Sequence, residues 1–318
     1  MRFAIIGTNF ISDSFVEAAN AVKDAEIIAV LSRSAEHGGE FAKKHNIARV
    51  YTDIDKMLSD KDIDAVYVAS PTMCHAEQTV KALSRRKHVL CEKMIAHDYN
   101  AFLDMLNARD KSGRVLLEAM RPDFDPAFKV IKKGLSKIGK IRRASLEFCQ
   151  YSRRYDAFLR GEVLNAFNPE MKNSALADIG IYPLHLCARL FGEPEYFNSE
   201  SIYLHNGFEA AGVLTLHYGD MLATITYSKI TESVNPSVIE GELGSLIIDK
   251  ISAPTKITLK LRGSEPIILP YQPSENNMVY EIEDFIRIAE GRASAEEYLE
   301  ATDISLKIAS MALYENGN

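Results

Sequence analysis

The sequence predicts an α/β protein built in two parts: an N-terminal, doubly wound parallel sheet, followed by a C-terminal α+β domain with a large, mainly antiparallel sheet. Two observations predict this. Across the first 120 residues short apolar runs alternate with amphipathic stretches, which is the order of βαβ units with parallel strands. After Arg121-Pro122, extended segments separated by short turns take over. We therefore expect domains at residues 1–121 and 122–318.

The first domain is expected to alternate strands and helices along the whole of its length. Apolar runs predict strands at residues 3–6, 26–31, 64–69, 88–91 and 115–119. Amphipathic stretches predict helices at 10–22 and 35–45, with further helices between the later strands. Because such crossovers are right-handed, the carboxyl ends of the strands meet at one edge of the sheet, where ligands bind.

The second domain is expected to begin with a strand at 143–151, and a helix at 180–191 follows a polar loop. Further extended segments are expected at 209–218, 221–230, 238–242, 245–249 and 256–261. The turns Tyr218-Gly219-Asp220 and Leu243-Gly244 predict antiparallel neighbours joined by short hairpins. Amphipathic helices at 279–289 and 296–314 complete the domain.

Composition and charge exclude several classes of protein. Hydrophobic residues make up 47% and charged residues 25% of the 318 residues, as in ordinary globular proteins. The net charge is −7 and no basic block stands out, which argues against a nucleic-acid partner. No apolar run is long enough to cross a bilayer, and the first apolar run is too short and too quickly interrupted for a signal peptide. Four cysteines without a CxxC pair indicate free thiols in a reducing compartment, so we expect a cytoplasmic protein with no membrane partner.

A glycine follows the first strand directly and opens a helix, which is where the dinucleotide-binding turn of a Rossmann fold lies. The usual G-x-G-x-x-G is degenerate here, because Gly7 keeps the first position while Asn9 and Ser12 replace the other two. Asn9 is expected to tolerate an unusual φ better than most residues, and Ser12 is small enough to pack near a strand. A glycine turn without a ligand is the alternative. The residues expected to contact a dinucleotide are Gly7, Thr8, Asn9, Phe10 and Ile11.

The end of the second strand predicts which dinucleotide binds. An NAD-specific site usually has Asp or Glu here to bind the ribose 2′-hydroxyl, whereas this chain has Ser32 and Arg33. A carboxylate would repel a 2′-phosphate, while Ser32 can donate a hydrogen bond and Arg33 can make charge-assisted contacts. We therefore expect NADP(H), with NAD(H) as the less favoured cofactor. The alternative is a polar helix entry in which Ser34 is the N-cap.

Three further motifs stand at strand ends or at the start of a helix. They are Ala69-Ser70-Pro71-Thr72 with His75 opening the next helix, Cys91-Glu92-Lys93-Met94, and Ala177-Asp178-Ile179-Gly180-Ile181-Tyr182-Pro183-Leu184-His185. In this order they resemble the glucose-fructose oxidoreductase / inositol dehydrogenase (Gfo/Idh/MocA) family over nearly the whole chain. Leu117-Glu118-Ala119-Met120 and the segment from Gln150-Tyr151-Ser152 to Tyr155-Asp156 are similar to dihydrodiol dehydrogenase-like members of that family.

The resemblance implies roles for particular residues. It maps the family's catalytic lysine onto Lys93, and its second-domain Asp-x-Gly-x-(His or Tyr) motif onto Asp178, Gly180 and Tyr182. Met94 stands where the family usually has Pro, so we expect no cis peptide bond after the lysine. Further cofactor contacts are implied at Ser70, Pro71, Thr72, His75, Glu92 and Lys93.

The chemistry of these side chains agrees with the implied roles. Lys93 follows a buried strand at the carboxyl edge of the sheet, where a partly desolvated ammonium can hold a developing alkoxide. Asp178, Tyr182 and His185 are spaced i, i+4 and i+7, so on a helix they share one face. Tyr182 is expected to donate and accept the proton, and Asp178 to orient Lys93 or a substrate hydroxyl. His185 is the rival acid/base or a partner behind the site. The alternative is a helix-entry aspartate followed by core or interface side chains.

Two loop segments are candidates for substrate contact. Arg153 and Tyr155 lie just past the first strand of the second domain, and Asn165 and Phe167 lie in a polar, aromatic loop ahead of the catalytic helix. The alternative is that they are solvated loop residues. The spacing of Asp178 and Tyr182 is not a metal-ligand pattern, and we expect no metal site.

The residues and the resemblance together predict an NADP-dependent oxidoreductase. It would transfer a hydride between the nicotinamide and a carbonyl or secondary alcohol of a small-molecule sugar, cyclitol or dihydrodiol-like substrate. The broad antiparallel sheet is expected to pair with a second subunit, in a homodimer or homotetramer. One alternative is a non-catalytic NADP-binding sensor or regulator on the same fold. The other is an enzyme whose cofactor stays bound while two substrates react in turn.

Overall fold

The computed structural model describes residues 1–316 and divides into two compact units. The first unit comprises Met1–Met120 and Asn276–Leu299, and the second comprises Arg121–Glu275 and the chain from Glu300 onward. The segment Asn276–Leu299, which the sequence placed in the second domain, is therefore grouped with the first unit. An amphipathic pattern predicts a helix but does not reveal which distant sheet its apolar face will cover.

The first unit contains a six-stranded sheet in the order β3-β2-β1-β4-β5-β6, with every pair of neighbours parallel. Its strands are β1 (Arg2–Ile6), β2 (Glu26–Leu31), β3 (Arg49–Tyr51), β4 (Ala65–Val68), β5 (His88–Glu92) and β6 (Leu116–Ala119). The doubly wound parallel sheet is thus confirmed, and only β3 was not predicted. The strand order reverses between β1 and β4, so the carboxyl ends of these two strands form the switch point at which such sheets bind ligands.

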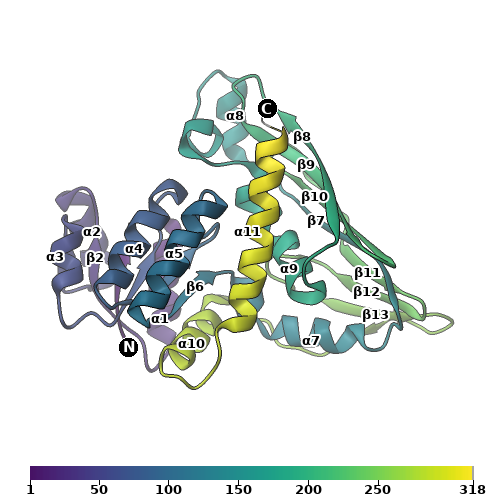
Figure 1. Cartoon of the computed structure of the whole chain (residues 1–318), viewed down its shortest axis with the longest axis horizontal. Helices are drawn as coiled ribbons and strands as arrows, with labels where there is room; N and C mark the ends of the chain where they lie inside the picture. The colour runs from purple at the N-terminus through teal and green to yellow at the C-terminus, as the bar shows by residue number, and fades with distance from the viewer. Residues whose placement is uncertain (317–318) are drawn as a thin grey trace. The chain divides into compact units, whose positions relative to one another are not determined.

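Helices pack on this sheet, and side chains at their N-termini cap several of them. They are α1 (Phe10–Ala21), α2 (Ala35–His45), α3 (Ile54–Ser59), the short η1 (Thr72–Cys74), α4 (His75–Ser84), α5 (Tyr99–Ser112) and α10 (Met278–Ala289) (Figure 1). The core joins β1, α1 and β4, because Phe15 stacks on Tyr67 with ring centroids 3.7 Å apart and also contacts Phe3 edge-on. Phe285 of α10 lies against Phe3, which explains why this late helix belongs to the first unit.

The second unit contains an eight-stranded sheet in the order β14-β13-β12-β11-β7-β10-β9-β8. Its strands are β7 (Ile141–Cys149), β8 (Tyr196–Tyr203), β9 (Glu209–Tyr218), β10 (Met221–Ser228), β11 (Ser237–Gly241), β12 (Gly244–Ile248), β13 (Ile257–Leu261) and β14 (Ile267–Ile268). All neighbours are antiparallel except β7 and β10, which confirms the mainly antiparallel sheet. Both predicted hairpins are present, since Tyr218 pairs with Met221 and Gly241 with Gly244.

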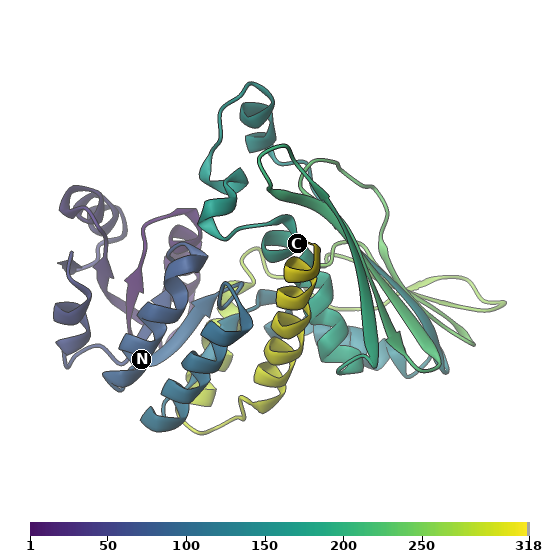
Figure 2. The ribbon, with the colours of Figure 1, turned by 45° about the horizontal axis from the view of Figure 1, so that its top comes forward.

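One face of this sheet is covered by helices of the same unit. The helix α7 (Pro126–Leu135) packs on β12 and β13, and α9 (Ile181–Phe191) packs on β7 and β10 (Figures 1 and 2). A π-helix, η4 (Leu176–Gly180), runs directly into α9 and contacts β10. The other helices that lie wholly in this unit are α6 (Arg121–Phe124), α8 (Arg153–Leu159), η2 (Asn165–Phe167) and η3 (Pro169–Met171). The long α11 (Glu296–Asn316) begins in the first unit and continues into the second.

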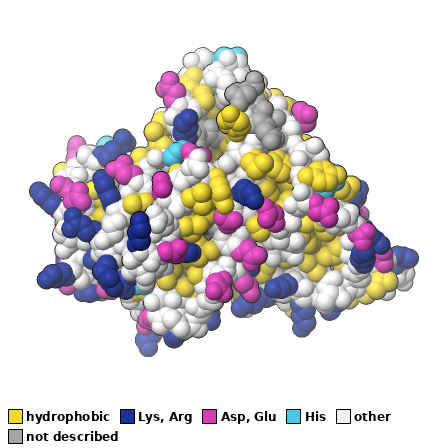
Figure 3. Space-filling view, viewed as in Figure 1, with side chains coloured by type: hydrophobic (Ala, Val, Ile, Leu, Met, Phe, Trp, Pro, Cys, Tyr) yellow, Lys and Arg dark blue, Asp and Glu magenta, His cyan; other side chains and the backbone are white. Residues whose placement is uncertain are grey.

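The surface carries charges of both signs. On the face drawn in Figure 3, Lys and Arg side chains lie among Asp and Glu side chains, in keeping with a net charge of −7. Within residues 1–316 the apolar stretch of every helix is too short or too polar to span a membrane. All four cysteines are free thiols.

Candidate functional site

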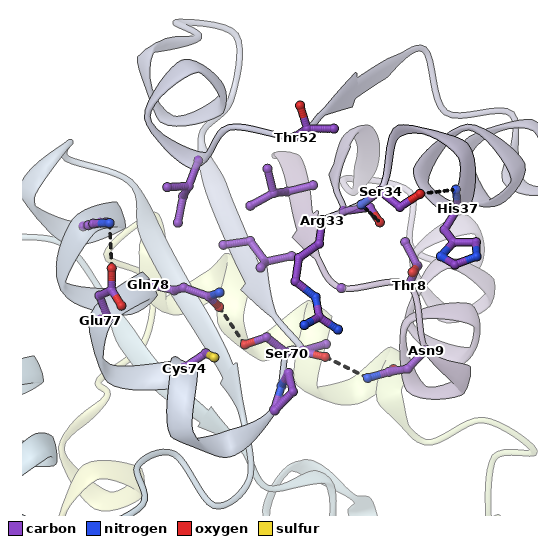
Figure 4. Close-up of a pocket in the computed structure, with 18 residues that line it drawn as sticks. Thr8, Asn9, Arg33, Ser34, His37, Thr52, Ser70, Cys74, Glu77 and Gln78 are labelled. Atoms are coloured by element: carbon purple, nitrogen blue, oxygen red, sulfur yellow. Dashed lines mark hydrogen bonds and ion pairs between the residues drawn. The ribbon is translucent and has the colours of Figure 1, made fainter. Parts of the chain in front are cut away.

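A cavity of about 760 Å³ lies in the first unit, beyond the carboxyl ends of β1, β2 and β4 (Figure 4). Seven of its lining residues were expected to contact a dinucleotide: Gly7, Thr8, Asn9, Ser32, Arg33, Ser70 and Pro71. The sequence did not single out the lining residues Ser34, His37, Thr52, Ile54, Cys74, Glu77, Gln78 and Lys81 for that role. They come from the start of α2, from the residues after β3 including the first residue of α3 (Ile54–Ser59), and from η1 and α4, and no local pattern marked them.

Gly7 is required by the geometry of the first βα turn. Its φ is +113°, and a Cβ on it would lie 2.6 Å from the carbonyl oxygen of Ala69 at the end of β4. An L-residue would therefore meet both backbone strain and a clash. The turn is thus held close to the switch point, where a dinucleotide approaches the backbone in this type of sheet.

Asn9 is the N-cap of α1. The expectation that asparagine stands here because it tolerates an unusual φ was wrong. Its φ is −90° and its ψ is 179°, which is ordinary extended backbone. Its Oδ1 accepts hydrogen bonds from the amides of Ile11 (3.1 Å) and Ser12 (3.2 Å), and its Nδ2 donates to Ala69 O at 2.8 Å. Asparagine stands here because it caps a helix and bridges two strand ends at once, and neither property requires an unusual φ.

For the segment after β2, a helix entry capped by Ser34 is compatible with a phosphate contact by Ser32 and Arg33. Ser34 caps α2, since its Oγ accepts a hydrogen bond from the amide of His37 at 3.3 Å. Arg33 extends into the cavity, as Figure 4 shows, and Ser32 lies on the cavity wall with only 9% of its surface exposed. A guanidinium and hydroxyls at this end of the cavity, without a carboxylate at positions 32–34, suit a phosphate better than a bare ribose.

His75, which was expected to contact the cofactor, is 1% exposed and lies beneath the loops that line the cavity. Its Nε2 is 2.8 Å from Ser70 O and its Nδ1 is 2.9 Å from Met94 O. Burial lowers the pKa of the ring, so a neutral His75 donates to one of these carbonyls. Ser70 also donates from Oγ to Gln78 Oε1 at 2.6 Å, which fixes the residue after β4 from a second direction.

Lys93 follows β5, and its surroundings are held by buried side chains. The preceding Glu92 accepts a hydrogen bond from the hydroxyl of Tyr67. The peptide bond between Lys93 and Met94 is cis, so the expectation of a trans bond without proline was wrong. The following amide, that of Ile95, donates to Glu118 Oε1 at 2.9 Å, and the Met94 carbonyl lies against His75. Side chains from β6 and α4 therefore hold this turn.

The remaining predicted cofactor residues follow directly after residues that line the cavity. Phe10 opens α1 and is 70% exposed, and Ile11 follows it. Thr72 is in η1 directly after Pro71. Contact between these residues and a cofactor stays a prediction.

In the second unit, the motif that carries Asp178 and Tyr182 is split between two kinds of helix. Asp178 lies in the π-helix η4, and Tyr182 and His185 lie in α9. A π-helix has a wider turn than an α-helix, so the α-helical spacing from which a common face was inferred does not apply across η4. Tyr182 is 7% exposed, with its ring centroid 5.7 Å from that of Phe148. Asp178 forms an ion pair with Lys229, Oδ2 to Nζ 2.9 Å, a partner that the sequence did not indicate.

His185 is buried in an ionic cluster of the second unit. Its Nε2 lies 2.7 Å from Asp123 Oδ2 and its Nδ1 lies 3.3 Å from Ser305 Oγ. Arg189 donates from Nε to the other oxygen of Asp123 at 3.2 Å. The three ionisable side chains are between 2% and 7% exposed. These contacts favour the interpretation of His185 as a partner behind the site.

Side chains of the loop ahead of η4 form a small aromatic cluster. Phe158, Phe167 and Phe208 form a buried cluster, and Tyr155 stacks on Phe158 and Phe167 with centroids 5.9 and 5.6 Å apart. Phe167 is fully buried, which contradicts the alternative of a solvated loop for its side chain, and its contact with a substrate stays a prediction, as does that of Tyr155. Substrate contact through Arg153 and Asn165, which are exposed on this segment, stays a prediction.

Comparisons with known proteins agree with this geometry. The model of the Gfo/Idh/MocA oxidoreductase family with an NAD-binding Rossmann fold matches residues 1–120, and the C-terminal domain of the same family matches residues 129–247. The scyllo-inositol 2-dehydrogenase (NADP(+)) of Bacillus subtilis is 42% identical over 93% of this chain and 91% of its own length. A trans-1,2-dihydrobenzene-1,2-diol dehydrogenase of Danio rerio is 30% identical over 90% of this chain and 87% of its own.

A solved structure shares the fold. A 3-ketoreductase of Actinomadura kijaniata, in complex with NADP and TDP-benzene, superimposes with a TM-score of 0.86 over 97% of this chain and 95% of its own, at 21% identity. The matches cover both units, and the expected resemblance is confirmed. The chain belongs to the Gfo/Idh/MocA family of oxidoreductases, with that family's NAD-binding Rossmann domain and its C-terminal domain.

Proposed function

We propose that this protein is an NADP-dependent dehydrogenase that interconverts a secondary alcohol and a ketone on a ring carrying vicinal hydroxyls. The observation that carries the cofactor preference is the pair Ser32 and Arg33 on the cavity, at the position where a carboxylate would select NAD. The Bacillus subtilis relative is named for NADP(+), which supports the same preference.

The cavity residues fit a phosphorylated dinucleotide. Arg33, Ser32 and His37 would hold the 2′-phosphate, and the backbone from Gly7 to Asn9 would face the pyrophosphate. Because the Asn9 side chain already caps the amides of Ile11 and Ser12, fewer helix amides are left for the pyrophosphate than in a glycine-rich turn. When bound, NADP(H) would supply or accept the hydride.

The catalytic groups that we propose are Lys93, Asp178 and Tyr182. During reduction the Tyr182 hydroxyl would give its proton to the carbonyl oxygen, and the ammonium of Lys93 would stabilise the negative charge that develops there. During oxidation Tyr182 would take that proton back. Asp178 would orient Lys93 or a substrate hydroxyl. His185, whose two ring nitrogens are engaged by Asp123 and Ser305, would support this helix without meeting the substrate.

Two of the curated relatives support a substrate class. One is named for scyllo-inositol and the other for trans-1,2-dihydrobenzene-1,2-diol, and both compounds are six-membered rings with neighbouring hydroxyls. We therefore favour a cyclitol, with ring-form sugars and other dihydrodiols as the next candidates.

A non-catalytic NADP-dependent sensor is the second candidate, and the degenerate glycine turn favours it because a sensor tolerates weaker cofactor contacts. The presence of Lys93, Asp178 and Tyr182 together favours the enzyme, because a sensor has no use for a proton donor.

We also propose a homodimer or homotetramer located in the cytoplasm. On the sheet face opposite α7 and α9, side chains such as Val213 and Leu222 are 40% and 45% exposed, while their strand neighbours Leu214 and Ala223 are fully buried. A broad sheet face of this kind is commonly covered by a second copy. Sedimentation velocity would test this, and a monomer at micromolar concentration would contradict it.

The experiment that tests the function compares NADPH and NADH binding by fluorescence titration for the wild type and Lys93→Ala. Oxidation of scyllo-inositol and of trans-1,2-dihydrobenzene-1,2-diol is then followed with NADP+. If the protein is a dehydrogenase, we expect both proteins to bind NADPH more tightly than NADH and only the wild type to turn over a substrate. NADPH binding without turnover of any polyol or ketone would favour the sensor, and no binding of either nucleotide would overturn both.

A further inference from the structure

Lys229 is a buried lysine at the end of β10 that neither the motifs nor the proposed chemistry accounts for. Its side chain is 4% exposed. Its Nζ lies 2.9 Å from Asp178 Oδ2 and donates to the carbonyl oxygen of Ala166 at 3.1 Å. The same ammonium lies over the rings of Phe167 and Phe208, 5.1 and 5.4 Å from their centroids. A single charge therefore contacts η4, the loop at η2 and the start of β9.

The backbone of Lys229 ties down the same region. Its amide donates to Ala210 O, and its carbonyl accepts from the amide of Ser152, each at 2.9 Å. Ser152 begins the segment 152–171, which contains α8 and the exposed Arg153 and Asn165. Lys229 thus joins the start of this segment and its residues 166–167 to Asp178.

The cost of burying the Lys229 ammonium explains why it is paired with Asp178 and hydrogen-bonded. A buried ammonium is tolerated only when it is paired and hydrogen-bonded, because its desolvation costs several kcal/mol. Here the pairing uses a carboxylate whose side chain remains 35% exposed, so Asp178 can still be reached from outside. An ammonium held by a backbone carbonyl and two aromatic faces has little freedom to move, and it restricts the carboxylate in turn.

We propose that Lys229 is a positioning residue for the reaction: it holds the Asp178 carboxylate in one orientation and couples that orientation to the substrate-side segment 152–171. This inference rests on the proposed function of Asp178. The Asp178 carboxylate would then reach its working orientation only when residues 152–171 are ordered.

The test uses the full-length protein with Lys229→Met, Lys229→Arg and a matched control, Lys87→Met. Methionine keeps the length of the side chain and removes its charge. Lys87 is a second buried lysine, 8% exposed, whose Nζ donates to the carbonyls of Asp60 and Ile63 in the first unit, so its loss lowers stability without reaching Asp178. Steady-state rates with scyllo-inositol and trans-1,2-dihydrobenzene-1,2-diol, NADPH affinity and hydrogen exchange at residues 165–171 and 176–180 are measured for each protein.

For Lys229→Met we expect kcat to fall about 100-fold, with the Kd for NADPH within about twofold of the wild type, because a misoriented group lowers turnover and not cofactor binding. Lys229→Arg restores the charge and should recover at least about a tenth of the wild-type rate. Exchange should become faster in both segments of Lys229→Met and remain unchanged there in Lys87→Met. Wild-type kcat in Lys229→Met, or a fall of equal size in the control, would overturn the proposal.

The outcomes separate this proposal from the function on which it rests. If the wild type oxidises neither compound and reduces no ketone, the proposed function fails, and hydrogen exchange alone decides the coupling. Unchanged exchange at residues 165–171 and 176–180 in Lys229→Met would then overturn it. If the methionine variant does not fold, Lys229→Gln supplies the same comparison, because glutamine also removes the charge and keeps a polar side chain, with kcat and exchange both read against the wild type.

Discussion

The imidazole of His75 lies 2.9 Å, Nδ1 to carbonyl oxygen, from Met94, the residue that follows Lys93. The other ring nitrogen lies 2.8 Å from the carbonyl oxygen of Ser70. One buried side chain at the start of α4 therefore joins the loop after β4, which lines the cofactor cavity, to the loop after β5, which carries the proposed catalytic lysine.

This connection predicts that His75→Phe weakens cofactor binding and slows turnover together. Phenylalanine fills the same space but donates to neither carbonyl, so the carbonyl that accepts from the neutral His75 loses its hydrogen bond, and we expect about a tenfold loss of NADPH affinity and a fall in kcat. Fluorescence titration and steady-state kinetics measure the two effects. Thr79→Val, one turn further along α4 and fully buried, is the matched control. A folded His75→Phe protein that binds NADPH like the wild type would show that the two loops are held by other contacts.

The cavity wall at Arg33 predicts a change of cofactor preference. Arg33→Ala removes the guanidinium expected to meet the 2′-phosphate, and a hydrogen bond to a charged group contributes about 1.5–3 kcal/mol. NADPH affinity should therefore fall about 10- to 100-fold while NADH affinity stays within about twofold. Arg85→Ala, an exposed arginine at the end of α4, is the control. Equal losses for both nucleotides would place Arg33 on the adenine or pyrophosphate and leave the NADP preference unexplained.

The absence of a side chain at Gly180 allows η4 to pack closely on the sheet, and this predicts the effect of adding one. A Cβ at this position would lie 2.7 Å from Cγ of Tyr227 and 2.9 Å from Cδ1 of Leu176, so the helix that carries Asp178 would be pushed off β10. We expect Gly180→Ala to destabilise the protein by about 1–3 kcal/mol, as overpacking does, measured by urea unfolding.

The control for that substitution is Gly39→Ala in α2. A Cβ there meets no atom within 4 Å, so the change should be neutral or stabilise the protein by about 0.4–1 kcal/mol. If Gly180→Ala behaves like the control, the close approach of η4 to Tyr227 is not needed for folding.

Local patterns predicted most of the fold, and long-range contacts explain what they missed. The bounds of β2 and β9 were predicted to the residue, because each is a largely apolar segment between turn signals. The strand β8 was missed because Asn198, Ser199 and Glu200 in its middle lack apolar character, and β3 because it has only three residues. The side chains of β3 are partly exposed, so no alternation of buried and exposed residues indicates a strand there.

The candidate site divides in the same way. Gly7, Arg33 and Lys93 could be found because each lies within two residues of the end of a predicted strand. The partners that hold the site could not be found, since Lys229 is 51 residues from Asp178, and Asp123 is 62 residues from His185. Nothing in a local pattern marks a lysine or an aspartate as buried when its counter-ion lies that far along the chain. The π-helix was missed for another reason, because helical periodicity in so short a segment does not distinguish a π-helix from an α-helix.

Glu209 predicts a dependence of stability on pH. It is 3% exposed, its Oε2 accepts a hydrogen bond from the amide of Leu176 at the start of η4, and burial raises its pKa to about 7 in spite of its hydrogen bonds. In the folded protein it therefore keeps its proton at pH values where the unfolded chain has released it. Stability linked to this group is fully present below about pH 4.5 and is lost as the pH rises through 7, by at most about 3 kcal/mol.

Glu209→Gln tests this dependence because glutamine keeps the carbonyl that accepts from Leu176 and cannot ionise. We expect the free energy of unfolding of the wild type to fall, relative to that of Glu209→Gln, as the pH is raised from 5 to 8, so that the variant is the more stable protein at pH 8. Urea unfolding at several pH values measures the difference, and Glu240→Gln, a more exposed carboxylate of the same sheet, is the control. Parallel stability curves for wild type and Glu209→Gln across this range would mean that Glu209 is ionised in the folded protein, and that its charge is balanced by the ions around η4.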